Sequence, residues 1–257
     1  IWNKEFRFFK NWHTGSRIRN IKKSIHSLEN QTQKPDKIFL NIPYKYRRFE
    51  NGVLDKDIPA FENKNVEITR CDDCGPGTKL LGSLNKLKKN STIILADDDQ
   101  IYEDYMIEKL YYFSSLYPNN AYSFYVHPIG DIGVGQGADG FAINTNSLDG
   151  IEIFYERVVK DYKELFLYDD LWISFFLIHF KKNKVFSLRN YLKKDSSGNP
   201  TLIYKSHSSQ SGLISTYATN LKEAVKKRDD IAKKSLLFMQ EKSKGLKIWL
   251  IFVYKFF

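Results

Sequence analysis

Ser91-Thr-Ile-Ile-Leu-Ala-Asp97-Asp98-Asp99-Gln-Ile101 is the stretch around which the chain is organised. Its β-branched, apolar first half is typical of a strand buried in a sheet. The three adjacent carboxylates that follow repel one another unless positive charge neutralises them. Carboxylate oxygens suit Mg²⁺ or Mn²⁺, and the structural alternative is a solvated acidic turn before a helix starting near Tyr102. The stretch predicts a strand that ends in one of these two features.

Length and charge narrow the classes of partner. With 257 residues, of which 42% are hydrophobic, the chain can form one large domain, or one domain with an appendage. The formal net charge is +10. Such an excess predicts an anionic partner: a nucleotide, a phosphorylated substrate, nucleic acid or an acidic membrane surface.

Cysteine content and the C-terminus bear on location. Cys71 and Cys74 form one C-x-x-C pair, which is too few ligands for a zinc site and suits a reducing, cytoplasmic compartment. No apolar run reaches the ~20 residues that span a bilayer. The aromatic, lysine-flanked segment 247–257 would suit peripheral contact with anionic lipid on the inner face of a membrane, or packing against the domain. We therefore divide the chain into a domain over 1–235, with an irregular start over 1–13, and a basic, aromatic tail over 236–257.

Hydrophobic spacing predicts alternating helices and strands in the first half. Expected strands are 37–42, 66–69 and 92–96, and expected helices are 18–28, 80–87 and 102–116. This alternation is typical of an α/β sandwich with a largely parallel sheet. Ligands of such folds sit at the carboxyl ends of the strands, so Asp73 and the triple aspartate are expected to share one crevice.

The second half continues less regularly. Expected strands are 121–126 and 141–144, and expected helices are 151–166, 168–179 and 220–240. Between them, Gly135-Gln-Gly-Ala-Asp-Gly140 formally matches G-x-G-x-x-G, but it leads into a strand and not a helix. We therefore predict no dinucleotide site there, and expect a flexible substrate loop over 130–140.

Four elements in order carry a family resemblance. They are Ser16-Arg17 with Ser27–Pro43, then Asp73–Leu81, then Asp97–Asp99, then Tyr168-Asp-Asp170. In this order and spacing the chain resembles GT-A-fold glycosyltransferases, in particular a small group from bacteria and large viruses. The resemblance implies a GT-A-like three-layer sandwich with a mostly parallel central sheet. It also implies metal-dependent transfer of a sugar from a nucleotide-diphosphate donor, expected to be a UDP-sugar, to a glycan, lipid-linked or other hydroxyl acceptor.

The resemblance also implies roles for the acidic triplet. Asp97 and Asp98 would face the ribose and sugar of the donor. Asp99 would coordinate Mn²⁺ or Mg²⁺ at the diphosphate. His207 lies where some members place a further metal ligand or a phosphate contact.

Further roles follow from the same resemblance. Asp73 would lie beside the base, and Lys79 and Arg17 would support the base or the phosphates. Asp170 resembles the general base on the acceptor side, and the residues alone do not separate it from Asp169. A carboxylate that opens a helix is also a common cap, which is the structural alternative for both.

Two other classes of function compete with a transferase. A basic nucleic-acid-binding module would gather basic residues on one face and has no use for three adjacent carboxylates. A sugar-nucleotide nucleotidyltransferase shares the α/β layout and the metal, but would need a Gly-rich loop followed by Arg and Lys near the N-terminus. We see no such loop in the sequence, and expect no nucleic-acid partner.

Overall fold

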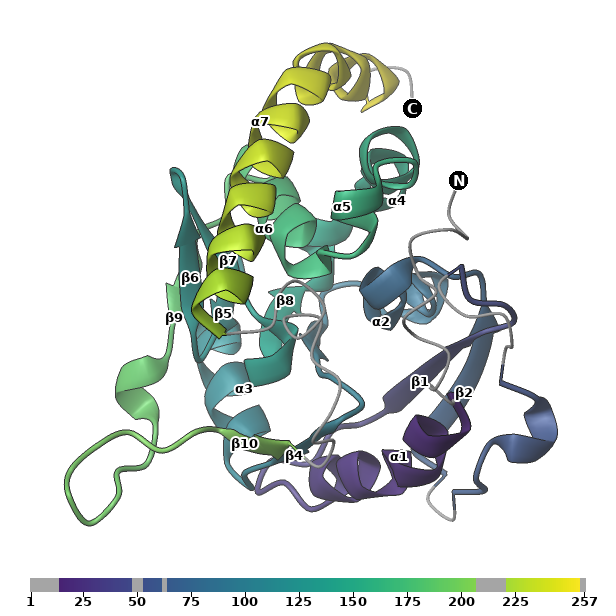
Figure 1. Cartoon of the computed structure of the whole chain (residues 1–257), viewed down its shortest axis with the longest axis vertical. Helices are drawn as coiled ribbons and strands as arrows, with labels where there is room; N and C mark the ends of the chain where they lie inside the picture. The colour runs from purple at the N-terminus through teal and green to yellow at the C-terminus, as the bar shows by residue number, and fades with distance from the viewer. Residues whose placement is uncertain (1–13, 48–52, 62–63, 207–220, 255–257) are drawn as a thin grey trace.

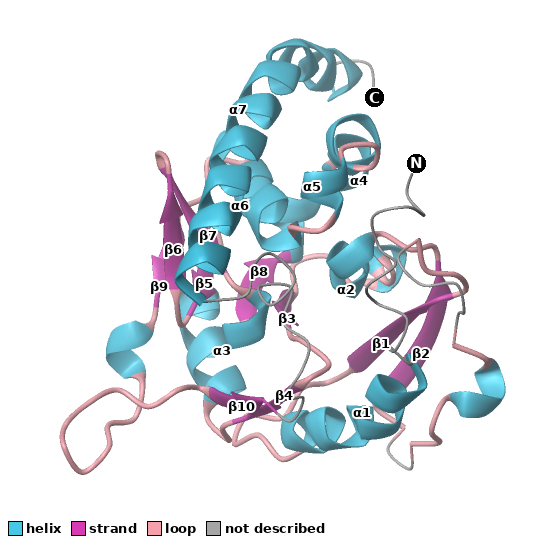
Figure 2. Cartoon of the chain, viewed as in Figure 1, coloured by secondary structure: helices cyan, strands magenta, loops and turns pink. Residues whose placement is uncertain are grey.

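The computed structural model describes residues 14–47, 53–61, 64–206 and 221–254 (Figure 1). Within these residues the chain is a mixed α/β structure in which helices surround several small sheets (Figure 2). The strands are β1 (Ile38–Pro43), β2 (Val66–Cys71), β3 (Thr92–Leu95), β4 (Gln100–Tyr102), β5 (Ala121–Ser123), β6 (Val126–Ile129), β7 (Ile132–Gly135), β8 (Phe141–Asn144), β9 (Val185–Ser187) and β10 (Tyr204–Ser206). The α-helices are α1 (Thr14–Glu29), α2 (Thr78–Leu81), α3 (Met106–Leu116), α4 (Ile151–Phe154), α5 (Lys163–Phe166), α6 (Asp169–His179) and α7 (Leu221–Tyr254).

The prediction of a mostly parallel central sheet is wrong. The largest described sheet has four strands in the order β3-β8-β5-β9, and only the β5–β9 pair is parallel. The other parallel pair, β1–β2, forms a sheet of its own with Ile38 opposite Val66. The physical reason is the β6–β7 hairpin, which turns the chain back so that β8 runs antiparallel to both β3 and β5.

The β1–β2 pair is covered on both faces because its side chains alternate. Ile38 and Ile42 of β1 point toward α1, where they join a cluster with Ile21 and Ile25. Asn41 points the other way and donates from Nδ2 to the carbonyl oxygens of Thr78 and Lys79, at 3.1 Å each. Residues 78 and 79 open α2, so β1 is clamped between α1 and α2.

Most elements of the first half are confirmed, with some boundary corrections. The strands over 37–42, 66–69 and 92–96 and the first helix all form. The helix expected from residue 102 begins at Met106, because β4 occupies Gln100–Tyr102 and pairs with β10. The helix expected over 80–87 is shorter, since α2 ends at Leu81 and a 3-10 turn follows over Leu84–Lys86.

The second half departs further from expectation. The strand over 121–126 ends at Ser123, and the helix over 151–166 is broken into α4, a π-helical turn over Tyr155–Val159, and α5. The region 130–140 is an ordered hairpin and 3-10 turn and not a flexible loop, with Ile132 and Val134 buried.

Helix α7 crosses the expected domain boundary at 235 without a break (Figure 1). Its buried residues Ala232, Leu236, Met239 and Leu246 belong to the same core cluster as Trp172. Among the described residues, no helix combines the length and the apolar character that crossing a membrane requires.

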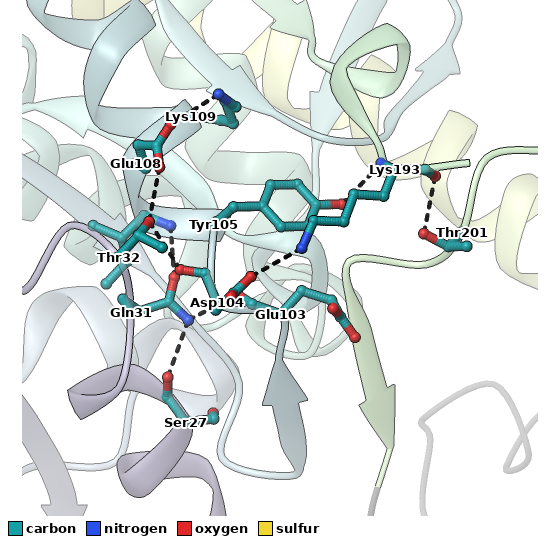
Figure 3. Close-up of polar contacts among 11 residues, drawn as sticks. Ser27, Gln31, Thr32, Glu103, Asp104, Tyr105, Glu108, Lys109, Lys193 and Thr201 are labelled. Carbon is teal, nitrogen blue, oxygen red and sulfur yellow. Dashed lines mark hydrogen bonds and ion pairs between the residues drawn. The ribbon is translucent and has the colours of Figure 1, made fainter. Parts of the chain in front are cut away.

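A buried glutamine fixes α1 to the turn that follows the triple aspartate. Gln31 donates from Nε2 to the carbonyl oxygens of Ser27 (3.0 Å) and Glu103 (2.8 Å), and its Oε1 accepts from the amide of Ile107 (2.9 Å; Figure 3). Thr32 extends the contact through a hydroxyl hydrogen bond of 2.8 Å to Glu108. The end of α1 and the start of α3 are therefore held together beside β4.

Candidate functional site

A cavity of about 1320 Å³ lies between the β1–β2 sheet and the four-stranded sheet β3-β8-β5-β9. It is lined by the whole of β1 and β3, whose facing edges are unpaired within the described part of the chain. The cavity reaches the triple aspartate at the end of β3 and Tyr168–Asp170 at the start of α6. The triple aspartate and Asp170 therefore line one cavity, whereas Asp73, which was expected to share a crevice with the triple aspartate, does not line it.

Neighbouring elements hold the triple aspartate in place. The hydroxyl of Tyr102 accepts the amide hydrogen of Asp97 (2.7 Å), and the hydroxyl of Ser24 donates to the carbonyl of Asp98 (2.8 Å). The side-chain amide of Gln100 donates to Oδ1 of Asp99 (3.0 Å). Backbone contacts thus fix the turn, while all three carboxylates border the cavity.

Lys79 joins the two acidic segments. Its ammonium lies 2.5 Å from Oδ1 of Asp97 and 3.2 Å from Oδ2 of Asp169, and its side chain is only 17% exposed. Burial opposes the charge on Lys79, but Asp169, Asp97 and Asp170 outweigh it and raise the Lys79 pKa well above the usual range. The ammonium is therefore charged and directed at carboxylates.

Gly137 lies at the centre of this cluster. Its amide donates to Oδ1 of Asp170 at 2.9 Å. A methyl group at this position would lie 2.5 Å from Nζ of Lys79, 3.4 Å from Oδ1 of Asp170 and 3.5 Å from Oδ1 of Asp97. Only a residue without a side chain lets the 3-10 turn Gly137–Asp139 approach Lys79 so closely.

Asp73 occupies a different position from the other predicted donor residues. Its Oδ1 accepts from the amide of Gly75 (2.9 Å) and its Oδ2 from the amide of Arg47 (2.6 Å). Asp73 is buried, and the cavity is lined by Gly75 and Pro76 beside it and not by Asp73. In this structure Asp73 braces the turn that leads into α2.

Two predicted site residues have no described side-chain position. Arg17 lies in α1, but its side chain is outside the described part of the structure, and His207 lies entirely outside the described residues. Their predicted roles stay predictions.

The metal prediction can be tested against the donor groups. Among the described residues, no group of three or more His, Cys, Asp or Glu side chains could hold a metal ion. Mg²⁺, however, is commonly bound by one or two carboxylates together with substrate phosphates and water. Asp98 and Asp99 at the cavity edge fit a cation that arrives with a diphosphate, and do not form a complete protein cage.

Asp139 is a buried carboxyl beside the site. Burial, and next the charge of Asp97, raise its pKa from 3.8 to about 7. The folded state therefore binds the proton more tightly than the unfolded state, and the associated stability is lost as pH rises from about 4 to about 7. Below this window Asp139 is neutral in both states, and above it the folded state contains a buried charge.

We expect Asp139→Asn to raise the free energy of unfolding at alkaline pH and to change it little near pH 4. The pKa difference sets an upper limit of about 4 kcal/mol on the gain. Urea titrations of both proteins at several pH values measure it. Asp161→Asn, at an exposed position, is the matched control. A gain that does not depend on pH would contradict the assignment.

Sequence patterns do not reveal two residues that build the site. They place Gly137 only in an expected flexible loop and Tyr102 only at an expected helix start, and they leave Asp169 and Asp170 as alternatives. The signal for Gly137 was the close backbone approach that glycine permits, but the partner proved to be Lys79 and not a ligand. The pairing of Tyr102 with Asp97 has no signal in the sequence, because it depends on β4 folding back.

Comparison of the chain with protein-family models gave no match, and neither did comparison with curated proteins.

Proposed function

We propose that the chain is a metal-dependent glycosyltransferase of GT-A-like architecture that uses a nucleotide-diphosphate sugar, with a UDP-sugar as the expected donor. The observation that carries the proposal is the convergence of two acidic segments on one cavity. Asp97–Asp99 close it at the end of β3, and Asp170 closes it at the start of α6. A donor site and an acceptor base must border the same cavity.

The chemistry assigns a role to each segment. An acceptor hydroxyl oxygen forms a bond to the anomeric carbon of the donor sugar, and the bond from that carbon to the phosphate oxygen breaks. The hydroxyl proton passes to the carboxylate of Asp170, and the nucleoside diphosphate leaves with the bonding electrons. Asp97 and Asp98 orient the donor sugar and ribose.

Asp99 would hold Mn²⁺ or Mg²⁺, with His207 as a further candidate ligand. When bound, the cation supplies charge stabilisation at the diphosphate leaving group. The carboxylates gathered at the end of β3 and the start of α6 also explain why a cation would be needed there, since carboxylates alone repel a diphosphate.

Thermal unfolding with ligands tests the proposal. We expect UDP with Mn²⁺ to raise the melting temperature, and UDP with EDTA or single-stranded DNA to leave it nearly unchanged. Stabilisation by DNA without stabilisation by UDP and metal would overturn the proposal. A screen of UDP- and GDP-sugars for donor hydrolysis would then identify the sugar.

Asp99→Ala is expected to weaken metal-dependent UDP binding by at least about tenfold, or ~1.4 kcal/mol, because it removes the predicted protein ligand of the cation. Isothermal titration with UDP at saturating Mn²⁺ measures the loss. Asp161→Ala is the control, since Asp161 is exposed and does not line the cavity. Unchanged UDP affinity, with metal still required, would exclude Asp99 as the ligand.

A further inference from the structure

The Lys79 side chain is largely enclosed by other groups of the protein, with only 17% of it exposed. Its ammonium lies between Asp97 and Asp169, at 2.5 and 3.2 Å, and Gly137 closes a third side. The side chain of Asp169 is itself only 7% exposed. The two carboxylates come from the end of β3 and the first turn of α6, so one lysine connects two segments that line the cavity, called here the donor wall (Asp97) and the acceptor wall (Asp169).

The segment that carries Lys79 is fixed independently of any ligand. The 3-10 turn Gly75–Gly77 precedes it, and a methyl group on Gly77 would lie 2.6 Å from the ring of Trp172 in α6. The carbonyl oxygen of Lys79 accepts a hydrogen bond from Asn41 of β1 at 3.1 Å. Lys79 is therefore anchored to β1 through its backbone, to α6 through the preceding turn, and to both acidic segments through its ammonium.

The Lys79 ammonium offsets the repulsion between the carboxylates that it connects. Asp97, Asp169 and Asp170 are three neighbouring carboxylates, of which Asp169 is almost fully buried, and Lys79 is a cation that contacts two of them. Without it the carboxylates of Asp97 and Asp169 would repel each other, and the walls that carry them would separate. Asp170 is adjacent to Asp169 on α6 and would move with it.

We propose that Lys79 is a positioning residue, which holds the donor wall at Asp97 and the acceptor wall at Asp169 in register so that Asp170 faces the donor sugar. Lys79 does not itself bind the base or the phosphates. The inference deepens the proposed function and rests on it for the role of Asp170. The ion-pair connection between the walls is a separate physical statement, which can be measured without activity.

The first test separates positioning from nucleotide binding. Lys79→Met keeps the length of the side chain and removes its charge. We expect turnover to fall by about 100-fold, the effect of a small misplacement of reacting groups, with the Kd for UDP and Mn²⁺ within about threefold of the wild-type value. A rise in Kd of about tenfold or more, with turnover nearly unchanged, would make Lys79 a nucleotide ligand and overturn the proposal. Lys193→Met is the control, because Lys193 forms an exposed ion pair with Asp104.

The second test detects the ion-pair connection between the two walls through the melting temperature alone. Lys79→Met leaves two carboxylates unpaired and is expected to lower the melting temperature by roughly 10 °C. Adding Asp169→Asn removes one of those carboxylates and is expected to restore a large part of the loss. If the two substitutions instead lower the melting temperature additively, the walls are not coupled through Lys79 and the proposal fails. This result holds even if the wild-type protein turns over no donor, an outcome that would overturn only the proposed function.

The third test moves the ammonium without removing it. Gly137→Ala places a methyl group 2.5 Å from the position of Nζ, so Lys79 must shift. We expect turnover to fall with UDP affinity retained, as for Lys79→Met. Gly245→Ala is the matched control, because no atom within 4 Å obstructs a methyl group there. Full turnover in Gly137→Ala would contradict the positioning role.

Discussion

Asp170→Asn is expected to lower the turnover of sugar transfer by about 10²–10⁴-fold, the usual contribution of a general base. Asparagine keeps the side-chain oxygen that accepts from the Gly137 amide, so the geometry of the site should survive. Metal-dependent UDP binding is therefore expected to stay close to the wild-type value. Single-turnover rates and UDP titrations on both proteins measure the two quantities.

The pH dependence of turnover adds a second readout. Burial and the charge of Asp169 raise the pKa of Asp170 well above the ordinary carboxyl range, while Lys79 acts in the opposite direction. A base works only when ionised, so turnover is expected to rise with pH, with its midpoint above about pH 4. Retained turnover in Asp170→Asn would show that Asp170 is not the base. A wild-type turnover that does not change with pH above about pH 4 would show the same.

Asp169 and Asp170 are adjacent, and the structure gives them different surroundings. Asp169 is buried against Lys79, whereas Asp170 is half-buried and accepts one amide hydrogen bond from Gly137. The Asp169 side chain is almost fully buried and paired with the Lys79 ammonium, so the more exposed Asp170 is better placed to reach an acceptor hydroxyl and is the better candidate base. The sequence alone could not reach this distinction, because it depends on where Lys79 lies in three dimensions.

Local pattern explains which elements were predictable. The strands over 38–43 and 92–95 follow from runs of β-branched and apolar residues, and α1 from isoleucines spaced three or four apart. These signals depend only on residues that are close in the sequence, so the elements they predict do not depend on how distant segments pack. The positions of Asp97–Asp99 at a strand end and of Asp169–Asp170 at a helix start were predictable for the same reason.

Pairing between strands was not predictable from the same signals. Strands β6 and β7 are only four residues long and include Pro128, Gly133 and Gly135, which are typical of loops. The antiparallel return of β8 is set by the β6–β7 hairpin and by buried side chains such as Phe141. The ion pairs of Lys79 belong to the same category, because they join segments far apart in the chain.

Trp172→Ala is expected to lower the free energy of unfolding by about 3–5 kcal/mol. The indole is fully buried in the main core cluster and lies 5.7 Å from the ring of Tyr155, centroid to centroid. The Gly77 backbone rests on its edge, so the substitution also opens a cavity beneath the turn that carries Lys79. Urea denaturation measures the loss, and Phe186→Ala, at a ring that is 43% exposed, is the control for a smaller effect.

Trp172→Phe separates packing from polarity at this position. The indole nitrogen of Trp172 is buried with no hydrogen-bond partner among the described residues, so its removal ends a desolvation cost while most of the ring volume stays. We expect this variant to lose clearly less stability than Trp172→Ala. Equal losses would mean that the fused ring, and not filled volume in general, supports the Gly77 turn. Because that turn positions Lys79, turnover in Trp172→Ala should fall by more than its unfolded fraction explains.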